Sequence, residues 1–235
     1  MKISFHNSIE EISRESWDAL IGDLNYPFLK HDFLKTLEIT NCVGTNTGWI
    51  PIHITIERDK ELIAAMPLYL KSHSQGEFVF DHAWANAFYQ HGLDYYPKLV
   101  SSIPHTPASG PRFLLKDGEE KSVLFEKIKE GVKMISSKNN ISSWHILFPE
   151  KDEINFYENS QLSIRKNAQF IWFNKNYKNF ENYLENFRSR HRKNVLKERN
   201  KIKEQDLIIE TLSGEALDYE ICLLYTSDAA DEEAW

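Results

Sequence analysis

The N-terminal part of the chain changes from an alternating pattern to helical periodicity. Residues 1–5 alternate between polar and apolar, which predicts a short strand. Ser8, with Glu11 three residues later, forms a capping-box pattern ahead of helically spaced apolar residues, and this predicts a helix that ends near Gly22. A second helical pattern predicts a helix over residues 30–40.

The period then changes to two, which predicts a β-hairpin. Residues 49–57 place four isoleucines on one face: Ile50, Ile52, Ile54 and Ile56. The turn Arg58-Asp59-Lys60 leads into a continuous apolar run over residues 61–71, which is typical of a strand buried on both faces. The two segments are therefore expected to pair as antiparallel strands.

After Gly76 the pattern is less regular and richer in aromatic residues. It predicts strands over residues 77–80, 98–103, 112–115, 142–148, 163–173 and 206–212. It predicts helices over residues 82–90, 119–138, 150–159 and 179–203. This order, without repeats or low-complexity segments, predicts an α/β domain whose sheet combines antiparallel hairpins with helical crossovers.

Composition narrows the class of protein. The 235 residues are 41% hydrophobic, enough for one large domain or two small ones. The longest apolar run, residues 62–70, is too short to cross a bilayer, which excludes an integral membrane protein. Two cysteines, Cys42 and Cys222, cannot form a disulfide framework, and the first residues lack the pattern of a secretory signal. We therefore expect a cytoplasmic protein.

Charge is distributed in blocks that the net value of -7 conceals. Residues 186–203 contain eight Lys or Arg and one Glu, a net charge of +7, whereas residues 215–235 contain seven acids and no base. The basic block can bind anions, although the chain as a whole would not.

Several long stretches together resemble one known family. They read NYPFLKHDFLKTLE, VGTNTGWIPIHITIE, AAMPLYLKSHSQGEFVFDHAWANAF, YYPKLVSSIPHTPASGPR and QFIWFNKNYKNFENYLENFRSRHRKNVLKERNKI. They are similar to the FemAB-like family of predicted N-acyltransferases, over nearly all of residues 1–221. The resemblance implies a GNAT-like α/β fold, with a mixed, largely antiparallel sheet flanked by helices, present twice in tandem. It also implies a link to peptidoglycan biosynthesis.

One departure from the pattern leaves the acyl donor open. The GNAT signature Q/R-x-x-G-x-G/A forms a turn whose backbone N–H groups cradle the pyrophosphate of coenzyme A. None of the nine glycines lies in this pattern. We therefore expect a donor that binds as a co-substrate, either acyl-CoA or aminoacyl-tRNA, and no tightly held cofactor.

The second departure concerns length, because members of the family continue into a second acyltransferase domain. We expect an N-terminal fragment with a first GNAT-like domain over residues 1–178. Residues 179–221 would supply the basic helix and strand that begin the second domain. Residues 222–235 are expected to be a non-native tail, since the run CLLYTSDAADE resembles the translation of a sequencing adapter.

The basic helix is the strongest local signal for binding. Helical winding places apolar residues in one stripe with basic residues on both sides. One interpretation is a solvated amphipathic helix; the other is a phosphate-binding element for a nucleotide-linked precursor or a tRNA acceptor stem. The candidate anion-binding residues are Arg188, Arg190, Arg192 and Lys193.

The section from Asp81 to Arg112 is the candidate acceptor cleft, because it gathers aromatic and ionisable residues beside loop signals. The candidate substrate-binding residues are Asp81, His82, Trp84, Tyr96, Lys98, Thr106 and Arg112. Asp81 next to His82 suggests a carboxylate that orients an imidazole base, although Asp is also a preferred N-cap. The alternative for the whole section is an aromatic cluster that serves packing alone.

Other chemistry has little support in the sequence. The nine histidines are scattered, and neither cysteine has a partner at a metal-ligand spacing, so no metal site is predicted. A covalent nucleophile is not indicated, since no G-x-S-x-G motif is present. We expect acyl or aminoacyl transfer to an amine, on a small molecule or cell-wall precursor. A non-catalytic precursor-recognition module is the alternative, and a DNA-binding role is not expected.

Overall fold

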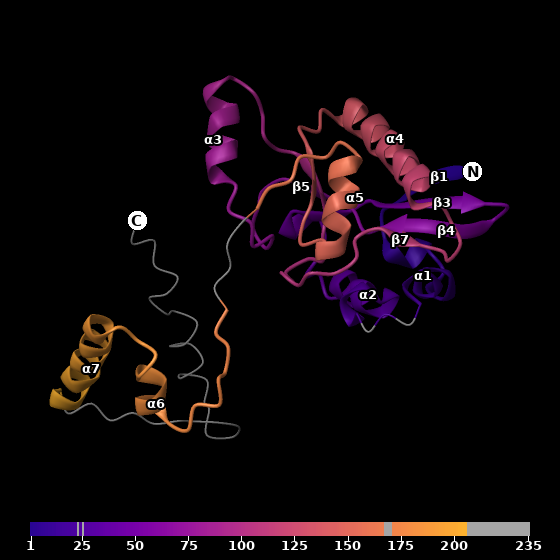
Figure 1. The fold of residues 1–235 in the computed structure, drawn as a ribbon. Helices are drawn as coiled ribbons and strands as arrows, with labels where there is room; N and C mark the ends of the chain where they lie inside the picture. Colours follow the sequence, from indigo (N-terminus) through magenta and orange to yellow (C-terminus); the bar gives the residue numbers. More distant parts are fainter. Residues whose placement is uncertain (23, 25, 167–170, 206–235) are drawn as a thin grey trace. The chain divides into compact units, whose positions relative to one another are not determined.

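The computed structural model describes residues 1–22, 24, 26–166 and 171–205 (Figure 1). The chain divides into two compact units, Met1–Lys166 and Asn167–Trp235. The strand predicted over residues 206–212 and the tail predicted over 222–235 lie outside the described residues. The domain limits expected from the sequence, with a first boundary after residue 178, remain a prediction.

The first unit contains a mixed α/β fold. Its strands are β1 (Lys2–His6), β2 (Trp49–Pro51), β3 (His53–Arg58), β4 (Glu61–Met66), β5 (Tyr69–Lys71), β6 (Lys98–Ser101), β7 (Leu114–Leu115) and β8 (Trp144–Ile146). Its α-helices are α1 (Arg14–Ile21), α2 (His31–Ile39), α3 (His82–Gln90), α4 (Lys121–Asn139) and α5 (Ile154–Asn159). Short 3-10 helices occupy Ile9–Glu11, Pro27–Leu29, Thr45–Thr47 and Lys151–Glu153.

The strands form two four-stranded sheets with the orders β1-β3-β4-β7 and β2-β5-β6-β8. All pairs are antiparallel except β6 with β8, which are parallel. In Figure 1, α4 lies on one side of β3 and β4 while α1 and α2 lie on the other. The mixed, largely antiparallel α/β class predicted from the sequence is therefore confirmed.

Two apolar clusters fill the spaces on either side of the first sheet. The alternation of side chains divides neighbouring residues of β4 between them, because Ala64 packs with the α4 side and Ala65 with the α1 and α2 side. Ile54 and Ile56 of β3 both face α4, where Phe125 and Ile128 complete the cluster. This burial on both faces stabilises the sheet as a rigid scaffold.

The chain passes from one sheet to the other within the segments predicted as single strands. The segment predicted as a single strand over residues 49–57 divides into β2 and β3, and the segment over 61–71 divides into β4 and β5. Between β6 and β7 the chain leaves the ladder for residues 102–113. Each long strand thus begins in one sheet and ends in the other.

Proline explains where these interruptions fall. Pro51 ends β2 and Pro67 follows β4, and a proline has no N–H to donate to a ladder. At the junction the backbone N–H of Ile52 donates to the oxygen of Leu68 at 2.8 Å. The N–H of Leu68 donates to Nδ1 of His53 at 3.3 Å, so a buried imidazole replaces a strand partner.

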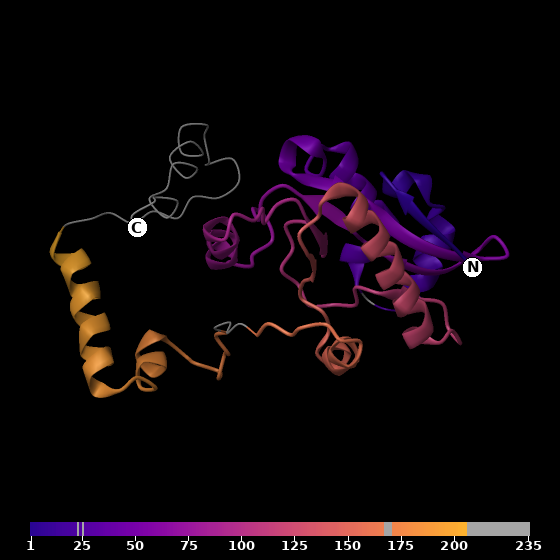
Figure 2. The same ribbon diagram turned by 90° about the horizontal axis from the view of Figure 1, so that it is seen from above.

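The β3–β4 turn matches its prediction. Asp59 and Lys60 both have positive φ, 52° and 70°, as a two-residue hairpin turn of the type I′ class requires. In both views α3 lies at the end of this unit remote from that turn (Figures 1 and 2). The hairpin turn therefore lies at one end of the unit, and α3 (His82–Gln90) lies near the opposite end.

Other predicted elements differ from the structure in informative ways. The helix expected from Ser8 is divided, since Ser8 caps the 3-10 helix Ile9–Glu11 and Ser13 caps α1. The strand predicted over residues 77–80 is wrong, because this segment is irregular. The described part of residues 163–173 contains no strand.

The second unit is helical where the structure describes it, with α6 (Phe180–Leu184) and α7 (Ser189–Glu204). One continuous helix over residues 179–203 was expected, and a break over residues 185–188 divides it instead. None of the helices in the described part of the chain is both long and apolar enough to span a membrane.

Candidate functional site

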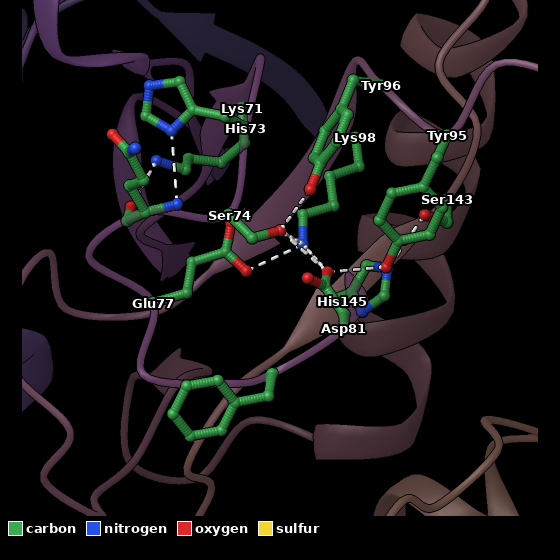
Figure 3. Close-up of polar contacts among 12 residues, drawn as sticks. Lys71, His73, Ser74, Glu77, Asp81, Tyr95, Tyr96, Lys98, Ser143 and His145 are labelled. Carbon is green, nitrogen blue, oxygen red and sulfur yellow. Dashed lines mark hydrogen bonds and ion pairs between the residues drawn. The ribbon is translucent and has the colours of Figure 1, made fainter. Parts of the chain in front are cut away.

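The most concentrated polar site in the first unit surrounds the ammonium group of Lys98, the first residue of β6. Its Nζ donates to Glu77 Oε2 at 2.8 Å, to Asp81 Oδ2 at 2.5 Å and to Ser74 Oγ at 2.8 Å (Figure 3). The side chains of Lys98, Glu77 and Asp81 are each at most 2% exposed. All three protons of the ammonium group are therefore used within the protein.

A second lysine makes this an assembly of four buried charges. Lys71 lies directly opposite Lys98 in the β5–β6 pair and is fully buried. Like charges opposite one another on a sheet repel, so the two carboxylates of Glu77 and Asp81 are needed to balance them. Lys71 Nζ lies 3.9 Å from the centroid of the Trp49 ring and donates to the carbonyl of Gln75 at 3.1 Å.

Burial shifts the pKa values of these groups in different directions. It raises the pKa of Glu77 above its usual value, although Lys98 and Lys71 oppose the shift. Burial also acts on Asp81, but the hydrogen bonds from Lys98, Ser74 and Tyr95 outweigh it and lower the pKa of that carboxyl. Burial, with repulsion from Lys98, lowers the pKa of Lys71 to about 8.

Two tyrosines and a histidine border the cluster. The hydroxyl of Tyr95 donates to Asp81 Oδ2 at 2.8 Å, and the hydroxyls of Tyr96 and Ser74 lie 2.7 Å apart. Burial raises the pKa of both tyrosines. His145 of β8 is half-buried, and burial with the nearby charge of Lys98 lowers its pKa to about 4, so its imidazole is neutral at physiological pH.

In the segment between Gly76 and α3, acidic side chains are buried and aromatic side chains are exposed, which is the reverse of the usual pattern. Glu77 and Asp81 point inward and are 2% exposed, whereas Phe78 and Phe80 are 58% and 80% exposed. Phe78 has a φ of 56°, a left-handed conformation that is uncommon for a bulky residue. The inward-facing acids therefore hold two aromatic side chains at the surface.

The structure brings together three of the residues predicted to bind substrate: Asp81, Tyr96 and Lys98 (Figure 3). His82 and Trp84 lie on the first turns of α3 and are exposed. Among the described residues His82 forms no side-chain hydrogen bond, since Asp81 is bound to Lys98 instead. Trp84 has the guanidinium of Arg165 5.9 Å from its ring centroid.

Arg112 and Thr106 belong to the segment over residues 102–113 that connects β6 to β7, which we call the excursion. Thr106 donates to the carbonyl of Pro104 and is half-buried. Arg112 is fully buried, and its guanidinium donates to the carbonyls of Leu147, Ala108 and Pro111 and to the hydroxyl of Tyr26. These contacts fasten the excursion to the end of β8.

The excursion also depends on one close approach at Gly110. A Cβ at this position would lie 2.3 Å from the ring of Tyr26, and the Gly110 N–H donates to the carbonyl of Phe148 at 3.1 Å. The backbone can follow this path only because glycine has no side chain.

The predicted anion-binding residues lie on or next to α7. Arg188 precedes the first turn, and Arg190, Arg192 and Lys193 follow on that turn and the next. Arg188, Arg190 and Lys193 are exposed, and Arg192 is half-buried. Their side chains are accessible to an anion from solvent.

Sequence reasoning missed Lys71, Ser74 and Glu77 as members of the buried cluster. A signal was present, because Glu77 and Asp81 enclose the apolar run Phe78–Phe80. Acids at both ends of such a run are ordinarily solvated, so the pattern suggested a strand. Within the described residues no group of three or more His, Cys, Asp or Glu side chains is arranged to hold a metal ion.

Comparison with known proteins places this architecture in a family. A family model described as peptidoglycan biosynthesis/recognition matches residues 8–227. The chain belongs to the FemAB-like family. A search of curated proteins finds no match.

Several solved structures that align with this chain at low sequence identity are N-acetyltransferases. An aminoglycoside 6'-N-acetyltransferase from Acinetobacter haemolyticus is 10% identical, with 74% of this chain and 98% of that chain covered and a TM-score of 0.44. A ribosomal-protein-alanine N-acetyltransferase from Brucella melitensis is 7% identical, with 74% and 99% covered and a TM-score of 0.43. The aminoglycoside N-acetyltransferase AAC(6')-Iy, solved with CoA, is 10% identical, with 74% and 94% covered and a TM-score of 0.44.

Proposed function

We propose that this protein takes part in N-acyl transfer, in which an acyl or aminoacyl group passes to an amine on a peptidoglycan precursor in the cytoplasm. The observation that carries the proposal is the family match over residues 8–227. The donor, acyl-CoA or aminoacyl-tRNA, binds as a co-substrate.

The chemistry needs no covalent enzyme intermediate. The amine nitrogen attacks the acyl carbonyl, the new C–N bond forms as the bond to the departing thiol or ribose oxygen breaks, and the amine proton passes to a base. Backbone N–H groups near a strand interruption are suited to stabilise the oxyanion that develops. His82 is the candidate base, because it is exposed at the start of α3 and has no competing partner among the described side chains.

In this proposal the predicted binding residues have two roles. Trp84, Tyr96 and Thr106 border the acceptor, with His82. Asp81, Lys98 and Arg112 are buried and act by positioning the section that carries those residues. The basic residues Arg188, Arg190, Arg192 and Lys193 bind anionic groups of the donor or precursor.

A second function, recognition of a precursor without catalysis, is favoured by one observation. The strongest polar cluster, around Lys98, is closed to solvent and its ionic groups bind one another. A site of this kind positions a surface but offers no acid or base to a substrate. A recognition module would bind the precursor and leave the acyl chemistry to another domain.

The test is to incubate the whole chain with a UDP-linked peptidoglycan precursor and either acetyl-CoA or alanyl-tRNA. Mass spectrometry of the precursor detects transfer, and calorimetry with the precursor alone detects binding. Transfer supports the enzyme, and binding without transfer supports the recognition module. If the precursor neither binds nor changes mass, both functions are contradicted.

His82→Gln and Trp84→Leu are each expected to weaken acceptor affinity roughly tenfold, about 1.4 kcal/mol, with no change in Tm. The reason is that both side chains are exposed, so they contribute little to packing. Tyr89→Leu is the matched control, since this aromatic residue is also exposed on α3 but lies about two turns beyond His82, near the other end of the helix. Unchanged acceptor affinity and rate in both variants would remove His82 and Trp84 from the site.

A further inference from the structure

The second unit contains a hollow of about 450 Å³ with aromatic walls. Its lining residues are Trp172, Asn174, Tyr177, Asn179, Phe180 and Tyr183. The volume is within the range of small-molecule sites, and apolar walls with a few amide groups are the usual composition of such sites. No acidic or basic side chain contributes to the lining.

The rings are arranged to receive a flat aromatic ligand. The Tyr177 and Tyr183 rings are T-shaped at 5.2 Å, and the Trp172 ring lies 6.1 Å from Tyr177 and 6.4 Å from Tyr183. Trp172 is 62% exposed, which leaves much of its indole accessible for stacking. An open indole beside two fixed tyrosines forms a platform for a nucleobase.

Two amides border the hollow with donors available. Asn174 Oδ1 accepts from the N–H of Asn176, and Asn179 Oδ1 accepts from the N–H of Asn182. Among the described residues neither Asn174 nor Asn179 donates its side-chain NH₂ to a partner. These NH₂ groups can donate to the ring nitrogen and carbonyl acceptors on the edge of a base.

A basic helix face lies next to these walls. The guanidinium of Arg199 on α7 lies 4.1 Å from the ring centroid of Phe180, which lines the hollow. Helical spacing places Arg192 and Lys203 on the same face of α7 as Arg199. Lys197 and Lys201 lie on the opposite face. One side of α7 therefore presents positive charge beside the aromatic platform.

We propose that this hollow binds the base of a nucleoside phosphate, whose phosphates are bound by Arg192, Arg199 and Lys203. Stacking on Trp172 and Tyr177 holds the base, and charge-assisted hydrogen bonds hold the phosphates. The inference rests on the proposed function, because acyl-CoA, a tRNA acceptor end and a nucleotide-linked precursor all carry a base next to phosphate. The inference places the binding of this base and its phosphates in the second unit.

The experiment measures binding to the whole chain by calorimetry, with no acceptor present. The probes are adenosine 3',5'-bisphosphate, UDP and a single-stranded RNA that ends in CCA, with inorganic pyrophosphate as the probe that lacks a base. Trp172→Leu and Tyr177→Leu are each expected to reduce affinity for the three base-containing probes roughly 5- to 150-fold, as the loss of one stacking contact predicts. Pyrophosphate affinity should not change in either variant.

The role of the basic face of α7 is tested with matched double variants. Arg199→Gln with Lys203→Gln should reduce nucleotide affinity about tenfold or more and lower its salt dependence, whereas Lys197→Gln with Lys201→Gln should leave both nearly unchanged. If the RNA binds more tightly than both mononucleotides, the natural ligand is an RNA end such as a tRNA acceptor end. Equal or tighter binding of a mononucleotide identifies a small donor or precursor.

Two outcomes would overturn the proposal: no binding of any base-containing probe, or binding that Trp172→Leu and Tyr177→Leu both leave unchanged. Helix content by circular dichroism is the check on folding, and Trp172→Phe should retain affinity because it retains a stacking ring. Nucleotide binding without acyl transfer would contradict the enzymatic function alone. Transfer without base-dependent binding would contradict this site alone.

Discussion

Replacing Lys98 with methionine is expected to lower the free energy of unfolding by about 3–5 kcal/mol at neutral pH. The ammonium group binds Glu77 and Asp81 at 2.8 and 2.5 Å, and all three side chains are almost completely buried. Methionine preserves the length of the side chain but leaves two carboxylates with one buried cation, Lys71, for balance. An uncompensated buried charge is among the most destabilising changes in a protein interior.

The loss of stability in Lys98→Met should depend on pH, and the direction of this dependence follows from the pKa values of the two carboxyl groups. Without Lys98, burial raises the pKa of both Glu77 and Asp81 above their unfolded values of about 4. The folded variant then binds more protons than the unfolded chain, so its stability falls as pH rises from about 4 through the raised pKa values. The difference from the parent protein should therefore be smallest in acid and largest at neutral pH.

Urea unfolding followed by circular dichroism at several pH values measures this effect. Lys116→Met is the matched control, because Lys116 pairs with Glu61 at the surface, where both side chains are at least 44% exposed. A surface pair of this kind contributes about 0–1 kcal/mol, with little pH dependence in the same direction. A Lys98→Met variant as stable as the control at neutral pH would show that the cluster is not a stabilising centre.

The fold was predictable from the sequence where periodicity is strong and local. The helix over residues 82–90 and the hairpin around Asp59 and Lys60 match the structure, because spacing and turn chemistry are encoded within a few residues. The division of two predicted strands between sheets was not anticipated. Pro51 and Pro67 carried the signal, but the period-two alternation continues across Pro51 and the apolar run continues across Pro67, so each segment suggested one strand.

The candidate site was predictable only in part. Asp81, Tyr96 and Lys98 were selected from a dense section and do converge, but their partners Ser74 and Glu77 lie before that section. Burial of an acid depends on a cation that another strand supplies, and a single sequence does not specify which residues face each other across strands. The hollow near Trp172 was missed for a similar reason, since it forms only when α6 and the preceding segment come together.

Arg112 was expected to bind substrate, and its position leads to a different expectation about stability. The side chain is fully buried, and its guanidinium donates at 2.9 Å to Leu147, at 2.6 Å to Ala108 and at 3.3 Å to Tyr26. Arg112→Met should lower the free energy of unfolding by about 3 kcal/mol or more, since several buried acceptors lose their donor together. The control is Arg14→Met, which removes a surface pair with Asp32 and should cost less than about 1 kcal/mol.

Hydrogen exchange distinguishes a structural Arg112 from one that contacts a ligand. Because the guanidinium fastens residues 104–111 to the end of β8, Arg112→Met should speed exchange of the Gly110 amide, which donates to Phe148 at 3.1 Å. Exchange in α4, on the far side of the first sheet, should rise only as much as global stability falls. Arg112→Lys should restore little, because an ammonium group cannot reach carbonyls in three directions. Weaker precursor binding by Arg112→Met, with unchanged Tm and unchanged exchange at Gly110, would instead make Arg112 a direct ligand-binding residue.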